Sequence, residues 1–230
     1  MNIFEAIKSK SLDQLKEVIA KNNINSKDQY GRTPLHYAIV QKAPIELFKE
    51  LIDCGADINI EDKSHETVIY KAIKFENKQA IQILIDNGVE LNHPLGIKYT
   101  PWFSARHLPE IADLMLKTQG AVRLTLTKEE KDIIDKLLYL DEKNLEHNLE
   151  RLNTPELLHA FVLNFNWDDD ITPIDKILHN SLCKEITAIE MFELADGHYW
   201  LEHPNVKYKD DEQYVKLIND ILERFPQVLR

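Results

Sequence analysis

The sequence predicts an all-α protein, with a stack of short helical repeats in its first half and a further helical domain in its second. Three observations lead to this prediction. Apolar residues recur three and four positions apart, as at Leu47, Leu51 and Ile52, which is the spacing of a helix face. Two motifs recur 33–34 residues apart. Only 6 of the 230 residues are glycine, too few for the many tight turns of an all-β fold.

The repeat is defined by two motifs that recur in the same order. GRTPLHYAI at residues 31–39 aligns with HETVIYKAI at residues 65–73, an offset of 34. GADIN at residues 55–59 aligns with GVELN at residues 88–92, an offset of 33. Because two independent motifs share one period, the first half is predicted to be a helical solenoid.

The recurring residues have separate structural roles in this prediction. Thr33 is expected to cap a helix through its hydroxyl, and Pro34 to occupy the first turn, where it loses no hydrogen bond. Ala38 and its counterpart Ala72 are small enough for neighbouring helices to approach closely. The glycines that open GADIN and GVELN follow apolar helices and suit a left-handed C-terminal cap.

This pattern resembles the ankyrin repeat, which implies pairs of antiparallel helices joined by protruding hairpin loops. Four units are predicted: a starting cap over residues 2–28, repeats over 29–62 and 63–96, and a short closing unit over 97–122. The family uses the histidine found here as His36 for hydrogen bonds within the loop. Four positions depart from the family pattern and are expected to weaken the loop geometry but not the helix faces: His65, Val68, Tyr70 and Phe103.

The second half also reads as helical. Thr127 with Glu130 predicts a capping box, and Thr154 and Thr172, each followed by proline, predict N-caps. Residues 210–225 form an amphipathic pattern that Pro226 ends. We favour a separate domain docked on the solenoid over a diverged continuation of it, with an ankyrin-repeat domain at 1–122 and an acidic all-helical domain at 123–230.

Residues 155–200 are similar to a family of bacterial domains of unknown function that is marked by an N-W-D-D core. The matching positions are Asn166, Trp167, Asp168 and Asp169, followed by Pro173, Cys183, Ala188 and Phe192. The resemblance implies a bacterial or viral origin and no known chemistry.

The charge of the chain lies mostly in its second half. Residues 1–122 contain 15 Lys and Arg against 16 Asp and Glu, whereas residues 123–230 contain 13 against 23. A strongly acidic half repels nucleic acid and favours a basic partner. The alternative is a solvated surface that only aids solubility.

No motif predicts catalysis, a cofactor or a metal site. Adjacent carboxylates at Asp168, Asp169 and Asp170 could hold a divalent cation, but they lack the spacing of a calcium loop and could equally cap the helix that follows. His198 and His203 have no zinc-type spacing, and the two cysteines are expected to be reduced. Without a signal peptide or an apolar run of about 20 residues, the chain is predicted to be cytoplasmic.

These features predict a protein–protein interaction module that is not an enzyme. By family-level analogy, the leading hypothesis is a bacterial immunity protein that binds and neutralises a cognate basic toxin. The alternatives are an ankyrin scaffold or secreted effector that binds a host protein, and a hydrolase with a metal site at residues 168–170. We expect no nucleic-acid or membrane partner, and a monomer when unbound.

The resemblance to ankyrin repeats also implies which residues contact a partner, namely the hairpin tips and the exposed face of each first helix. These residues are Gln29, Tyr30, Arg32, Val40, Gln41, Lys63, Ser64, Glu66, Lys74, Phe75, Tyr99 and His107. In the acidic half the candidates are Asp168, Asp169, Asp170, Asp210, Asp211 and Glu212. Trp167, Tyr199 and Trp200 could be interface anchors or ordinary core residues.

Overall fold

The chain is all-helical, as predicted, with no strand among the residues described. The computed structural model describes the backbone of residues 1–204 and 209–229, and the side chains of these residues except those at 142, 143, 209 and 210. It contains two compact units, one formed by residues 1–93 and 99–115 and the other by residues 94–98 and 116–230. The predicted domain boundary after residue 122 stays a prediction.

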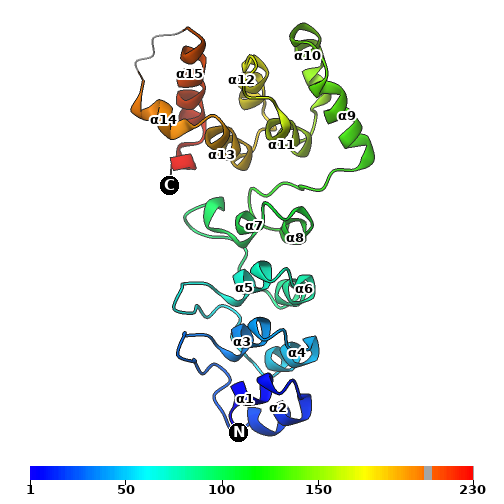
Figure 1. The fold of residues 1–230 in the computed structure, drawn as a ribbon, viewed down its shortest axis with the longest axis vertical. Helices are drawn as coiled ribbons and strands as arrows, with labels where there is room; N and C mark the ends of the chain where they lie inside the picture. Colours follow the sequence, from blue (N-terminus) through cyan, green and yellow to red (C-terminus); the bar gives the residue numbers. More distant parts are fainter. Residues whose placement is uncertain (205–208, 230) are drawn as a thin grey trace. The chain divides into compact units, whose positions relative to one another are not determined.

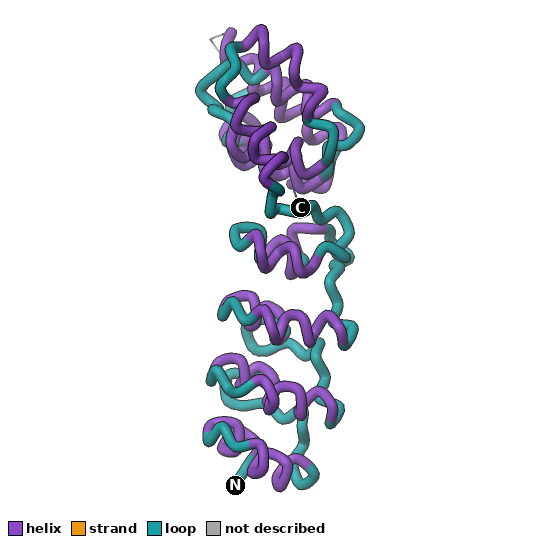
Figure 2. Tube along the Cα trace, turned by 90° about the vertical axis from the view of Figure 1, so that its right-hand side faces the viewer, coloured by secondary structure: helices purple, strands orange, loops and turns teal. Residues whose placement is uncertain are grey.

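The first unit is a stack of short antiparallel helix pairs (Figures 1 and 2). Within it, α1 packs on α3, α3 on α5 and α5 on α7, while α2 packs on α4 and α4 on α6. Its helices are α1 (Ile3–Lys8), α2 (Leu12–Ile19), α3 (Pro34–Val40), α4 (Ile45–Asp53), α5 (Val68–Lys74), α6 (Lys78–Asp86), α7 (Pro101–Ser104) and α8 (Pro109–Ala112), with the 3-10 turn η2 (Asp113–Met115). The 3-10 turn η1 (Ile97–Tyr99) includes residues of both units.

The small residues of the repeat lie where the stack is tightest. Ala38 and Ala72 are buried on the adjacent helices α3 and α5. Gly55 and Gly88 directly follow the caps of α4 and α6 with φ of +88° and +77°. Both glycines therefore adopt the predicted left-handed conformation, which a side chain would disfavour.

The second unit packs α9 on α11 and α11 on α13. Its central helix is α13, where seven successive residues from Ile186 to Phe192 are buried against α11, α14, α15 and η4. The elements are α9 (Lys128–Leu138), α10 (Glu142–Asn148), η3 (Leu149–Arg151), α11 (Pro155–Asn164), α12 (Thr172–His179), α13 (Glu185–Leu194), α14 (Gly197–Glu202), α15 (Lys209–Arg224) and η4 (Pro226–Leu229).

Two of the three predicted helix starts in this unit are confirmed. Thr127 and Glu130 form a reciprocal capping box at α9, and Thr154 caps α11. The third was wrong, because Thr172 is the first residue of α12 and not its cap. The N-cap position is taken by Ile171, whose side chain makes no cap bond. The Asp170 carboxylate accepts the Thr172 N–H at 2.7 Å in a turn that leads into the helix.

Candidate protein-binding surface

The hairpin loops of the repeats lie beside the first helices, α3 and α5, and away from the second helices, α4 and α6 (Figure 1). Each loop is closed by an aspartate whose carboxylate accepts backbone N–H groups. Asp28 binds the N–H groups of Tyr30 and Arg32 at 2.8 and 3.0 Å, and Asp62 binds those of Ser64 and Glu66 at 2.7 and 3.3 Å.

Each loop aspartate is also paired with a cation. Asp28 pairs with Arg32 at 2.7 Å, and Asp62 pairs with Lys71 at 2.9 Å. Burial would raise the pKa of both carboxyls, but these side-chain and backbone hydrogen bonds outweigh it and hold both pKa values below the usual range. Sequence analysis missed the two aspartates, although their spacing of 34 residues was a signal that could have revealed them.

Successive hairpins are also bonded to each other. The Lys63 N–H donates to the Tyr30 carbonyl at 3.2 Å, and the Lys63 ammonium donates to the Gln29 carbonyl at 2.9 Å. The Lys27 ammonium donates to the Glu61 carbonyl at 2.9 Å and so joins the same two hairpins. The two hairpin loops are therefore connected by hydrogen bonds beside the helices.

His36 connects its own helix start to the next hairpin. Its Nδ1 lies 2.8 Å from the Thr33 hydroxyl, and its Nε2 lies 3.0 Å from the Glu66 carbonyl. Since a carbonyl only accepts, Nε2 carries the proton in this arrangement. Burial lowers the pKa of His36, which favours this neutral ring, while the Glu66 carbonyl opposes the shift.

Tyr70 occupies the position of His36 in the next repeat and performs the same connection. Its hydroxyl donates to the Tyr99 carbonyl at 2.8 Å. The expected weakening of the loop by this departure is therefore absent at this contact. A phenol replaces an imidazole because either can donate one hydrogen bond at the end of a planar side chain.

The twelve array residues predicted to bind a partner, which we call the hairpin surface, are all half-buried or exposed. Tyr30, Phe75 and Tyr99 are 56%, 38% and 41% exposed, so the structure leaves part of each ring accessible. Phe75 caps the C-terminal end of α5, and the Tyr99 ring stacks on that of His93 with centroids 5.2 Å apart. Whether these residues contact a partner stays a prediction.

An aromatic and cationic cluster lies at the first full hairpin. The Arg32 guanidinium lies 4.6 Å from the centre of the Tyr30 ring and 5.3 Å from that of Tyr37. The Tyr37 ring in turn meets Phe4 edge to face, with centroids 5.4 Å apart. Sequence analysis named Tyr30 and Arg32 but not Tyr37 or Phe4, because helix spacing alone did not show that α1 and α3 bring these rings together.

The acidic candidates of the second unit fall at two separate places. Asp168, Asp169 and Asp170 are exposed in the loop before α12, where the Asp170 carboxylate accepts the Thr172 N–H. Asp211 and Glu212 lie in the first turns of α15, and the side chain of Asp210 lies outside the described residues. Within the described part of the chain, no group of three or more His, Cys, Asp or Glu side chains is arranged to hold a metal ion.

The aromatic residues that could be anchors or core residues are half-buried or exposed. Trp167 and Trp200 are half-buried and donate their indole N–H to the Val162 and Ala195 carbonyls at 3.3 and 2.8 Å. Trp200 also stacks on Tyr214, with ring centres 5.4 Å apart. Tyr199 remains 47% exposed.

The side chains that could be reactive are few. Cys183 is buried, and burial raises the pKa of its thiol to about 11, which keeps it protonated at neutral pH. Cys54 is exposed at the end of α4, where burial by its surroundings and the nearby Glu50 raise its pKa. Neither thiol is activated.

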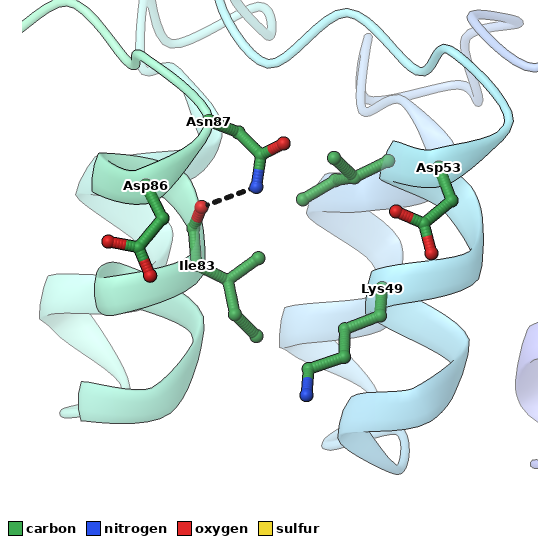
Figure 3. Close-up of a pocket in the computed structure, with 6 residues that line it drawn as sticks. Lys49, Asp53, Ile83, Asp86 and Asn87 are labelled. Atoms are coloured by element: carbon green, nitrogen blue, oxygen red, sulfur yellow. Dashed lines mark hydrogen bonds between the residues drawn. The ribbon is translucent and has the colours of Figure 1, made fainter.

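A shallow pocket lies between α4 and α6, on the side of the array away from the hairpins (Figure 3). Its lining is Lys49, Ile52, Asp53, Ile83, Asp86 and Asn87. The Asn87 amide donates to the Ile83 carbonyl of its own helix at 2.8 Å. None of the predicted binding residues lines this pocket.

Comparison with known proteins assigns both parts of the chain. The family of ankyrin repeats matches residues 3–94 and 40–128, and a domain of unknown function (DUF4274) matches residues 153–225. The first match covers more than half of the chain, which therefore belongs to the ankyrin repeat family. Ankyrin repeats are binding modules, so this chain contains a protein–protein interaction module.

Relatives match chiefly through the repeats. An ankyrin repeat protein of Rickettsia bellii (strain RML369-C) is 34% identical over 123 residues, which are 52% of this chain and 68% of that protein. Another from the same strain is 33% identical over 94 residues, 38% of this chain and 13% of its own length. BRCA1-associated RING domain protein 1 of Caenorhabditis elegans is 24% identical over 152 residues, 65% of this chain and 22% of its own length. The chain thus spans less than a quarter of these last two relatives.

Among the described residues, no helix combines the length and the apolar character that crossing a membrane requires.

Proposed function

We propose that this chain is a bacterial immunity protein, an inhibitor that acts by binding a basic toxin tightly in the cytoplasm. The observation that carries the proposal is the joining of a protein-binding repeat array to a second half with 23 acidic and 13 basic residues. The protein acts as a monomer that forms a complex with its target. No cofactor, nucleic acid or membrane takes part.

The hairpin surface supplies the contact area in this proposal. Its exposed Tyr30 and Phe75, together with Arg32, are of the residue types that contribute most to binding at protein interfaces. The hydrogen bonds between successive hairpins support a rigid surface, which lowers the entropic cost of binding.

The acidic second half gives speed and selectivity. Exposed carboxylates attract a basic protein over a distance that salt limits to about 8 Å at physiological ionic strength. Electrostatic attraction of this kind accelerates association and disfavours acidic competitors. The association rate should therefore fall steeply as salt rises, while the dissociation rate changes little.

The test is capture of the partner from the native cell, followed by a functional assay. We expect the captured protein to be basic, toxic when expressed alone and harmless when co-expressed with this chain. A partner without toxicity, or an association rate that does not change with salt, would contradict the proposal. Capture of a host protein would instead indicate a scaffold or effector, and metal-dependent hydrolysis lost in Asp168→Ala would indicate an enzyme.

A further inference from the structure

A small pocket with a mixed lining lies within the second unit. Four apolar residues and three aspartates line it: Leu140, Leu145, Phe165 and Pro173, with Asp141, Asp169 and Asp170. Two of the apolar lining residues are buried, since Leu145 is 6% exposed and Pro173 is buried in the first turn of α12. The aspartates, by contrast, are exposed.

The three carboxylates differ in the hydrogen bonds that they already accept. Asp141 caps α10 by accepting the Asn144 N–H at 2.9 Å, and this bond together with the Asn144 side chain lowers its pKa. Asp170 accepts the Thr172 N–H at 2.7 Å. These hydrogen bonds use part of each carboxylate and leave further acceptor positions, because an ionised carboxylate offers about four lone-pair sites.

We propose that this acidic pocket receives one arginine side chain of a protein partner. An arginine has an apolar stem that matches the apolar lining residues and a guanidinium that matches the three carboxylates. The lining also contains the aromatic ring of Phe165, a group on which a guanidinium can stack, and this ring contacts those of Phe161 and Trp167, with centroids 5.6 and 6.2 Å away. Lysine carries the same charge, but its ammonium is not planar and cannot stack on an aromatic ring as a guanidinium does.

The size of the pocket supports a side chain rather than a larger ligand. Its volume is about 290 Å³, at the lower limit of the roughly 300–1,000 Å³ found for pockets that bind drug-sized molecules. The salt bridge between Lys176 of α12 and Glu146 of α10, at 2.7 Å, joins two of the elements that line the pocket. The inference rests on the proposed function in one respect, namely that the partner is basic.

The experiment uses the full chain and a small probe, so that it does not need the toxin. N-acetylarginine N-methylamide is titrated into the isotope-labelled protein while backbone NMR shifts are followed. We expect saturable shifts at the pocket residues in the millimolar range. The neutral citrulline analogue should bind at least about fivefold more weakly, because it keeps the shape and loses the charge.

Substitutions then locate the binding. Asp169→Asn should weaken binding of the arginine probe about fivefold. Asp170→Asn should do the same, while its amide oxygen can still accept the Thr172 N–H. The matched control is Asp132→Asn, which removes one exposed charge from α9 outside the pocket and should leave binding unchanged. Equal weakening by Asp132→Asn would show general attraction to acidic surface and would overturn the proposal. Ca²⁺ shifting the same residues more strongly than arginine would also overturn it.

The outcomes separate this pocket from the proposed function. If the arginine probe binds the pocket but the captured partner is not toxic, the pocket stands and the immunity role fails. If a toxin binds with the same affinity to Asp169→Asn and to the wild type, the immunity role stands and the pocket proposal is wrong.

Discussion

Each compact unit buries one histidine beside a threonine hydroxyl, and the two histidines differ in the elements that they connect. In the array, His36 Nδ1 lies 2.8 Å from Thr33 and Nε2 reaches the Glu66 carbonyl of the next hairpin at 3.0 Å. In the second unit, His159 on α11 lies 3.1 Å from Thr187 on α13 and is 3% exposed. The array thus uses its histidine to join neighbours, and the second unit uses its histidine inside a core.

The largest expected effect of this difference is on the free energy of unfolding at acidic pH. Burial lowers the pKa of His159 to about 4 from a usual value of 6.5. The unfolded chain therefore binds a proton between these values while the folded chain does not, so stability is full above about pH 6.5 and falls as the pH drops towards 4. The loss should be about 3 kcal/mol in the free energy of unfolding.

Urea unfolding at pH 7 and pH 4.5 checks this prediction. His159→Gln should flatten the pH dependence more than the matched variant His36→Gln. The reason is that burial lowers the pKa of His36 against the opposing effects of the Glu66 carbonyl and the Asp62 carboxylate. If the two variants have equal pH profiles, the distinction between the histidines is wrong.

The second prediction compares the two hairpins of the array. Gly31 has a φ of +76°, and a Cβ there would lie 2.8 Å from the Lys63 backbone nitrogen. Gly31→Ala should therefore lower the free energy of unfolding by about 2 kcal/mol, through left-handed strain and displacement of the adjoining hairpin. Thermal or urea unfolding measures it.

The control for Gly31 is its counterpart His65, which has a φ of +58° and already carries a side chain. His65→Gly should leave stability unchanged or raise it by up to about 1 kcal/mol, since glycine removes the strain. Equal destabilisation by the two changes would contradict the role assigned to the close approach at Gly31.

A smaller effect is expected where tyrosine replaces histidine. Tyr70→Phe removes only the hydroxyl that donates to the Tyr99 carbonyl at 2.8 Å, and it should cost about 1 kcal/mol of unfolding free energy. Tyr30→Phe serves as the control, because the Tyr30 side chain is 56% exposed and its hydroxyl makes no hydrogen bond to the described part of the chain. Identical stability of Tyr70→Phe and the wild type would show that the bond to Tyr99 is not needed.

The sequence predicted the array in detail because one period fixed several residues at once. Thr33, Ala38 and Gly55 were each placed correctly, since a cap, a tight contact and a left-handed turn each favour few residue types. Tyr70 was interpreted as a weakness because the family pattern names the residue and not the bond it makes. Whether Tyr70 can make the bond that His36 makes in the preceding repeat depends on its distance to a carbonyl 29 residues away, which the sequence does not give.

The second unit was less predictable because the glycine-bearing motif of the array does not recur in its sequence. Helices could be located from apolar spacing, but the start of α12 was misplaced since Asp170 and Thr172 are both capable caps. The acidic pocket could not be predicted, because Asp141 and Asp169 come from loops 28 positions apart that only the packing brings together. Residue types alone gave Asp168, Asp169 and Asp170 equal weight, whereas only the last two line it.

The most direct test of the account is the affinity of the captured partner for the double variant Tyr30→Ala, Phe75→Ala. The prediction is a loss of roughly 2 kcal/mol or more in binding, with unchanged helical circular dichroism, because both rings belong to the hairpin surface. Tyr139→Ala is the matched control, since this ring is 90% exposed and lies in the second unit. Unchanged affinity in the double variant, with binding lost instead on replacing Asp168, Asp169 and Asp170 by Asn, would contradict the claim that the repeats contact the partner.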